Sequence, residues 1–169
     1  ADIFRNAGNL IVVSFRSNRI QKIAANAFHG APLQGLSLSF NQLSSLDGSI
    51  FDPIRDTLAE LHLDNNTIQE IPYGMFDSMH SLNYMELSFN EIKRLSSNSF
   101  RGSLANLTIL IARNNEIDAI DLEFFDQAEN LRDLDLLNNL CVSENFMDVG
   151  ENREEVRGRL RGCFNNYLG

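Results

Sequence analysis

The apolar positions of the chain recur in one pattern, LxxLxLxxNxL, which occurs six times at intervals of 23 to 25 residues. The motifs open at Leu10, Leu33, Leu58, Leu82, Leu107 and Leu131. Within the LxL part, apolar and other residues alternate with period two, which predicts a short strand with one buried face. One strand per repeat, backed by a bulkier returning segment, stacks into a curved parallel sheet with the strands on its concave side. We therefore predict an α/β solenoid.

Two further residue series keep the same period. An asparagine follows each strand, and we expect its side chain to point inward and bond to backbone groups that leave the sheet ladder. These residues are Asn18, Asn41, Asn66, Asn90, Asn115 and Asn139. A phenylalanine recurs in the returning segments and predicts a stacked aromatic spine of Phe28, Phe51, Phe76, Phe100 and Phe125. Phe4 lies at the matching offset before Leu10, so we expect the chain to begin inside an earlier repeat.

With six motifs in register over residues 10 to 139, the chain resembles the leucine-rich repeat family. The period and the phenylalanine series are similar to the secreted animal subclass found in Toll-type receptor ectodomains and small matrix proteins. The resemblance implies a horseshoe with a parallel concave sheet and an extracellular location. We expect a repeat array over residues 1–140, made of a partial repeat and six motifs, and a C-terminal cap over residues 141–169. The returning segments have room for a turn or one helical winding.

The tail after the last motif predicts a cap for the open end of the solenoid. Its apolar residues Val149, Val156, Leu160, Cys163 and Phe164 fall on one helical stripe, and Asp148 and Glu151 have capping-box spacing. These features predict one capping helix. The form CVxxxF followed by VxxxLxxCFxxY is similar to the terminator of small secreted insect leucine-rich repeat proteins, several of which act in immunity or cell recognition.

The two cysteines, Cys141 and Cys163, bracket the predicted helix. In a protein of the secreted class that the resemblance implies, they form a disulfide that ties the cap to the array. Two buried free thiols are the alternative. Two cysteines without a neighbouring histidine do not supply the four ligands of a structural zinc site.

Composition and charge narrow the classes of partner. The chain has 169 residues, 43% of them hydrophobic, so it can bury a core, and its formal net charge of −9 argues against nucleic acids and anionic membranes as partners. No run of about 18 apolar residues predicts a membrane span. The sequence contains no GxGxxG, P-loop, GxSxG or HExxH motif, so we expect no catalytic residues, no cofactor and no enzymatic activity. A metal site at Glu60, His62, Asp64 and Glu86 is not expected, because nothing predicts a second shell around these ligands.

The strand period also assigns the residues that point outward from the sheet. Several of them combine aromatic and aliphatic side chains with carboxylates, the mixture that protein interfaces use. The candidate partner-binding residues are Phe40, Glu60, His62, Asp64, Tyr84, Glu86, Phe89, Ile109, Ile111, Arg113, Asp135 and Leu137. The alternative interpretation is a solvated sheet with single exposed apolar residues, which are common on protein surfaces.

These observations favour a secreted recognition module that binds a protein partner through the concave sheet, with innate immunity, receptor signalling or adhesion as the setting that the resemblance implies. The alternative is a structural extracellular component that associates with itself. Two acceptor sequons begin at Asn65 and Asn106, and we expect N-linked glycosylation there. Of the two, Asn106 is favoured because it is predicted to lie farther from the concave centre.

Overall fold

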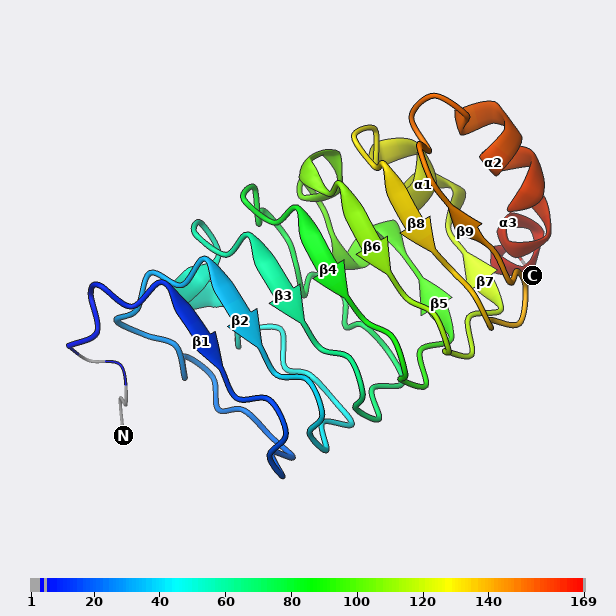
Figure 1. The fold of residues 1–169 in the computed structure, drawn as a ribbon. Helices are drawn as coiled ribbons and strands as arrows, with labels where there is room; N and C mark the ends of the chain where they lie inside the picture. Colours follow the sequence, from blue (N-terminus) through cyan, green and yellow to red (C-terminus); the bar gives the residue numbers. More distant parts are fainter. Residues whose placement is uncertain (1–3, 5, 169) are drawn as a thin grey trace.

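The computed structural model describes residue 4 and residues 6–168, and it contains one parallel strand for each of the six motifs. Figure 1 shows these strands side by side along one face of the molecule. They are β1 (Val12–Ser14), β2 (Gly35–Ser37), β3 (Glu60–His62), β4 (Tyr84–Glu86), β6 (Ile109–Ile111) and β8 (Asp133–Asp135). Neighbouring strands pair in register, so that Leu36 lies opposite Leu61 and Leu61 opposite Met85. The predicted α/β solenoid is confirmed.

The middle residue of each strand faces the core, as period-two alternation requires. From β2 to β8 these residues are at most 2% exposed: Leu36, Leu61, Met85, Leu110 and Leu134. In β1, the middle residue Val13 is only half-buried, because β1 is the edge strand of the sheet. The hydrophobic core is therefore one continuous layer behind the sheet that thins at β1.

The asparagine ladder has the predicted inward orientation from the second motif onward. In the third motif, Asn66 Oδ1 accepts from the backbone N–H of Leu43 at 3.0 Å, and Asn66 Nδ2 donates to the carbonyls of Leu38 and Leu63 at 3.1 and 3.0 Å. Each such amide joins one repeat to the repeat before it. Asn18 differs, because it is exposed and, among the described residues, its amide donates only to carbonyls of its own turn.

The returning segments form short elements, as their length predicts. They are the 3-10 turns η1 (Asp52–Ile54), η2 (Ser97–Ser99) and η3 (Leu104–Asn106), the two-residue strands β5 (Arg94–Leu95) and β7 (Ala119–Ile120), and the helix α1 (Leu122–Gln127). Strands β5 and β7 pair in parallel as a second, small sheet. Helix α1 begins where the Asp121 carboxylate accepts from the backbone N–H of Glu123 at 3.0 Å, a side-chain N-cap.

The phenylalanine spine runs through these returning segments and is confirmed as far as Phe100. Ring centroids lie 6.4 Å apart between Phe28 and Phe51, 5.8 Å between Phe51 and Phe76, and 5.0 Å between Phe76 and Phe100. Phe4 joins the spine at 6.1 Å from Phe28.

The prediction of Phe125 as the next member of the spine is wrong. Phe124 takes that place, with its ring 5.3 Å from that of Phe100. Phe125 instead packs against Phe164 of the C-terminal segment at 5.9 Å. The physical reason is that both phenylalanines lie in helix α1, where consecutive side chains point in directions about 100° apart.

The C-terminal segment covers the last repeat, but not with one helix as predicted. Strand β9 (Asn145–Phe146) adds antiparallel to β8, and two short helices follow, α2 (Arg153–Arg159) and α3 (Arg161–Tyr167), which meet at Leu160. The predicted capping box is also wrong. Asp148 has a φ of 53° and precedes α2 by several residues, while the N-cap of α2 is Asn152, whose side chain makes no cap bond.

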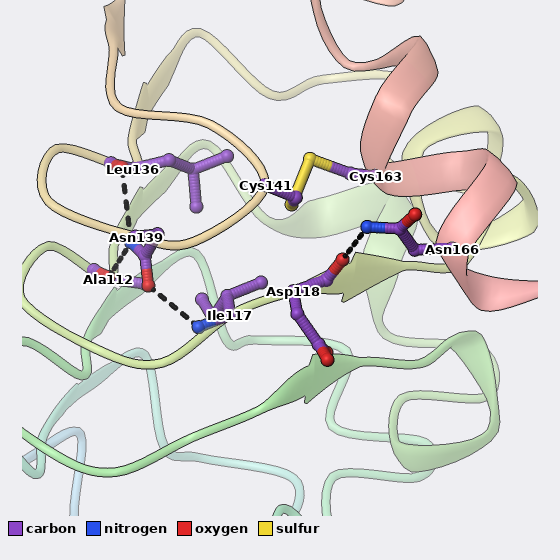
Figure 2. Close-up of a disulfide and its surroundings, with 8 residues drawn as sticks. All are labelled: Ala112, Ile117, Asp118, Leu136, Asn139, Cys141, Cys163 and Asn166. Carbon is purple, nitrogen blue, oxygen red and sulfur yellow. Dashed lines mark hydrogen bonds between the residues drawn. A yellow bond between two sulfur atoms is a disulfide. The ribbon is translucent and has the colours of Figure 1, made fainter.

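The apolar stripe of this segment is buried as predicted, and the disulfide is present. Val149, Val156, Leu160, Cys163 and Phe164 are all at most 7% exposed. Cys141 and Cys163 are joined, with their Cα atoms 5.1 Å apart. Figure 2 shows the disulfide beside a second tie, in which Asn166 Nδ2 donates to the carbonyl of Asp118 at 2.7 Å. The disulfide therefore joins α3 to the segment that follows the last motif, and the Asn166 hydrogen bond joins α3 to the returning segment of the preceding repeat.

Candidate functional site

The outward side chains of the sheet strands form one continuous surface, which we name the concave face. The first and third residues of each strand contribute to it, and the register aligns them into two rows across the strands. One row contains Val12, Gly35, Glu60, Tyr84, Ile109 and Asp133, and the other contains Ser14, Ser37, His62, Glu86, Ile111 and Asp135. The stacking of successive repeats is enough to bring these residues together.

The centre of the concave face lies over β3, β4 and β6. The ring of His62 lies 5.1 Å from that of Tyr84, and Tyr84 is opposite Ile109 in the sheet. Glu60 is exposed, whereas His62, Tyr84, Ile109 and Ile111 are half-buried. Partial burial, and then the charges of the neighbouring carboxylates, raise the pKa of the Tyr84 hydroxyl. The sequence-predicted residues of these three strands therefore do form one surface of aromatic, aliphatic and acidic groups.

Two of the predicted contact residues, Asp64 and Asp135, are buried rather than presented to solvent. Asp64 is 9% exposed, and its carboxylate accepts from Ser39 Oγ and, at 2.9 Å, from Asn65 Nδ2. Asp135 is 4% exposed and pairs with the guanidinium of Arg113. The expectation of freely exposed carboxylates at these two positions is wrong, because neighbouring repeats supply hydrogen-bond donors that draw both carboxylates inward.

Two exposed phenylalanines at the trailing edge of the concave face adopt left-handed backbone conformations. Phe40 has a φ of 55° and Phe89 a φ of 56°, and these residues are 42% and 51% exposed. The other motifs place Ser17, Asn65, Asn114 and Asn138 at the same position, also with positive φ. Asparagine tolerates this conformation, whereas a bulky aromatic residue in it is strained. The two phenylalanines thus cost stability while exposing apolar surface.

We expect Phe89→Asn to leave the fold intact and to raise the free energy of unfolding by up to about 1 kcal/mol, because asparagine adopts the left-handed region more readily. Equilibrium urea denaturation of both proteins measures the difference. Phe40→Asn is the matched variant, but its ring also accepts the Arg16 guanidinium at 4.2 Å, so its gain is expected to be smaller. A loss of stability in Phe89→Asn greater than about 1 kcal/mol would show that the ring packs as core.

Glu86 is the partly buried acid of the concave face. Its Oε1 accepts from the backbone N–H of Ser88 at 2.9 Å. Burial raises the pKa of the Glu86 carboxyl, and the hydrogen bond from the backbone N–H of Ser88 opposes that shift without cancelling it. The negative charge of Asp64 also raises the pKa, while His62 lowers it. The concave face therefore holds a carboxylate that retains its proton at higher pH than an exposed glutamate does.

The raised pKa of Glu86 gives stability a pH dependence of defined sign. The stabilisation that comes from the protonated Glu86 carboxyl is fully present below the pKa that Glu86 has in the unfolded chain. It is lost as the pH rises through the raised pKa of Glu86 in the folded protein. We expect Glu86→Gln to gain stability relative to the wild type as the pH increases across this range. Urea denaturation of both proteins at a series of pH values tests this expectation. A difference that stays constant with pH, or that changes in the opposite direction, contradicts it.

The described residues hold no group of three His, Cys, Asp or Glu side chains placed to bind a metal ion. Within the same part of the chain, no helix has the length and apolar character needed to cross a membrane. His29 and His80 lie in returning segments, away from His62.

One residue that the strand period assigns to the concave face, Ser88, is not among the candidate partner-binding residues. It follows β4 and is 4% exposed, and its hydroxyl makes no hydrogen bond within the described part of the chain. The sequence offers one signal for it, because Ser88 has the same motif position as Arg16, Ser39, Asp64, Arg113 and Leu137. The sequence does not indicate which member of this series lacks a partner.

Comparisons with known proteins agree with the repeat architecture. The leucine rich repeat family model matches residues 56–105. Human lumican is 36% identical over 84 residues, which are 48% of this chain and 24% of lumican. Leucine-rich repeat-containing protein 3 of Danio rerio is 33% identical over 72 residues, 42% of this chain and 27% of that protein. The chain therefore spans about a quarter of the length of these curated relatives.

Among solved structures, a chain in the Toll–Spatzle complex, which is described as a molecular hub in Drosophila development and innate immunity, superposes with a TM-score of 0.76. The two chains are 26% identical, and the match covers 82% of this chain and 18% of that one. These matches support the expectation that the chain is not an enzyme.

Proposed function

We propose that the chain is a secreted recognition module of the leucine-rich repeat class, which generally mediates protein–protein interactions, and that its concave face binds a protein partner. The observation that carries this proposal is the surface over β3, β4 and β6. There, Tyr84, Ile109 and Ile111 lie among the acidic residues Glu60 and Glu86 on hydrogen-bonded strands. Aromatic and aliphatic anchors on a rigid scaffold bind with little ordering cost.

Two observations support the finer parts of the proposal. A disulfide between Cys141 and Cys163 suits an oxidising compartment, and therefore secretion. The superposition on a chain of the Toll–Spatzle complex makes innate immunity or development a setting to test. The acidic net charge of −9 and the carboxylates of the concave face favour a partner with a basic surface.

The proposed function is tested by capturing proteins from extracellular fluid on the immobilised chain and identifying them by mass spectrometry. We then expect Tyr84→Ala with Ile111→Ala to weaken binding of the captured partner by about tenfold or more, because both side chains lie at the centre of the face. Tyr73→Ala is the matched control, since Tyr73 is 67% exposed but lies in the returning segment between β3 and β4. A partner that binds both variants equally contradicts the use of the concave face.

A second candidate function is self-association of a structural component through the β1 end. Ile11 and Val12 are 47% and 68% exposed there, and an apolar hollow of about 200 Å³ lies beside Phe15 and Ile23. Light scattering distinguishes the two functions. A monomer at the concentrations used for partner binding favours the recognition module, and a concentration-dependent dimer that Val12→Lys dissociates favours the structural role.

Glycosylation follows from the proposal of secretion. Asn106 is exposed at the end of η3, whereas the amide of Asn65 donates to Asp64 Oδ2 at 2.9 Å and lies at the edge of the concave face. We expect protein from a secreting eukaryotic host to carry a glycan at Asn106, and Asn106→Gln to remove it. Intact mass before and after glycosidase treatment measures this. An unchanged mass, or a glycan retained in Asn106→Gln, contradicts the assignment.

A further inference from the structure

The first two repeats contain a cation bound on an aromatic ring at the trailing edge of the concave face. Arg16 follows β1, and its guanidinium carbon lies 4.2 Å from the centroid of the Phe40 ring in the next repeat. Phe40 is exposed and has positive φ, so its ring projects from the surface rather than into the core. When one of these two motif positions is a cation and the other is phenylalanine, the cation lies over the aromatic ring.

The third and fourth repeats repeat this arrangement without the cation. Asp64 has the motif position of Arg16, and Phe89 has the position of Phe40. A hollow of about 210 Å³ opens beside the Phe89 ring. It is lined by Asp64, Asn65, Glu86, Ser88, Phe89 and Arg113. Among the described residues, no arginine or lysine lies over Phe89 as Arg16 lies over Phe40.

The charges around this hollow favour a cation. Asp64 and Glu86 contribute two carboxylates, and the guanidinium of Arg113 is paired with Asp135. Only one oxygen of Glu86 accepts a hydrogen bond within the described residues, from the backbone N–H of Ser88. The second carboxylate oxygen is therefore available to a donor.

Ser88 supplies an independent indication that the hollow binds a ligand. Ser88 lines the hollow and is 4% exposed, and its buried hydroxyl has no hydrogen-bond partner in the described structure. Ser39, at the same motif position two repeats earlier, donates to Asp64. A buried hydroxyl without a partner costs free energy, and a donor that enters the hollow relieves that cost.

We propose that the hollow beside Phe89 binds an arginine side chain of a protein partner, with the guanidinium stacked on the Phe89 ring and donating to the Glu86 carboxylate and the Ser88 hydroxyl. The inference rests on the proposed function, because it names the chemistry that the concave face recognises. A planar guanidinium combines stacking with several donors, whereas an ammonium group does not stack. The strained backbone of Phe89 fits this role, because it places the ring at the rim of the hollow.

The experiment uses the whole 169-residue chain and small probes in place of the unidentified partner. N-acetyl-arginine amide is titrated into isotope-labelled protein, and the backbone amide resonances of Glu86, Ser88 and Phe89 are followed by NMR. N-acetyl-citrulline amide, which has the same shape without charge, and N-acetyl-lysine amide are titrated in parallel. We expect saturable shifts at these three residues with arginine in the millimolar range, weaker binding of lysine, and no saturation with citrulline.

Three single variants identify the groups involved. We expect Glu86→Gln to weaken binding of the arginine probe by about tenfold, because a charge-assisted bond is lost. Phe89→Asn and Ser88→Ala are each expected to weaken it by about fivefold. Ser88→Ala is not expected to unfold the protein, since the hydroxyl that it removes has no partner. Tyr73→Asn is the matched control, an exposed aromatic residue outside the concave face, and we expect it to bind the probe as the wild type does.

The outcomes separate this inference from the proposed function. Absence of saturable shifts, equal binding of citrulline or lysine, or full binding by Ser88→Ala and Phe89→Asn overturns the arginine site. If the arginine site is overturned but a captured partner still needs Tyr84 and Ile111 for binding, the proposed function is still supported. Saturable arginine binding that the three variants weaken supports the site even before a partner is known.

Discussion

We expect Asn90→Ala to lower the free energy of unfolding by roughly 3 to 5 kcal/mol, because it leaves several buried backbone groups without partners. Asn90 Oδ1 accepts from the backbone N–H of Ile68 at 3.0 Å. Asn90 Nδ2 donates to the carbonyls of Leu63 and Leu87 at 3.0 and 2.9 Å. Leu63 and Ile68 belong to the preceding repeat, so the substitution also loosens one repeat from the next. Equilibrium urea denaturation followed by circular dichroism measures the loss.

Asn18→Ala is the control within the same ladder. Asn18 is exposed, and within the part of the chain that the structure describes its amide donates only to the carbonyls of Phe15 and Arg16 in its own turn. Because water can replace these bonds, we expect a loss below about 1 kcal/mol. Equal losses in Asn18→Ala and Asn90→Ala would contradict the idea that burial of the amide and its bonds to the previous repeat determine the cost.

We expect removal of the disulfide by Cys141→Ala with Cys163→Ala to cost about 3 kcal/mol, because the bridge closes a loop of 22 residues in the unfolded chain. The loop contains β9 and α2, so the loss is expected to concentrate in the C-terminal segment. Hydrogen exchange of α3 and urea denaturation measure the local and the overall effects. The bond between Asn166 and the Asp118 carbonyl is expected to keep α3 partly ordered.

Reduction supplies the control for this double variant. A thiol reductant is expected to destabilise the wild type to about the level of the variant and to leave the variant unchanged. Titration of the denatured, unreduced wild type should detect no free thiols. Two free thiols, or a wild type that is insensitive to reductant, would contradict the bridge.

The sequence by itself determined the solenoid. The spacing from Leu33 to Leu58 to Leu82 predicts one strand per repeat, because each strand alternates with period two and pairs with its neighbours in constant register. The asparagine ladder and the spine up to Phe100 follow from the same period, since every member has the same environment as the member one repeat away. The apolar stripe from Val149 to Phe164 was also predictable, because it depends on a local pattern, whereas the pairing of the two cysteines was expected from the family resemblance.

Only the tertiary structure decided the features that differ between repeats. A repeating pattern gives every motif position the same expected exposure, but the donors supplied by neighbouring repeats bury Asp64 and Asp135. The rotation of helix α1 places Phe124 rather than Phe125 in the spine. The break at Leu160 and the pairing of β9 with β8 depend on how the cap fits the last repeat.

The same holds for the arginine site. Ser88 and Phe89 have ordinary motif positions in the sequence, and what sets them apart is the set of side chains that adjacent repeats place around them. Ser39 donates to Asp64, which has the same motif position one repeat later, whereas the residue in that relation to Ser88 is Arg113, whose guanidinium has no acceptor. A buried hydroxyl without a partner results from packing in three dimensions, because it depends on which groups the neighbouring repeats place around it. It produces no periodic pattern or motif in the sequence.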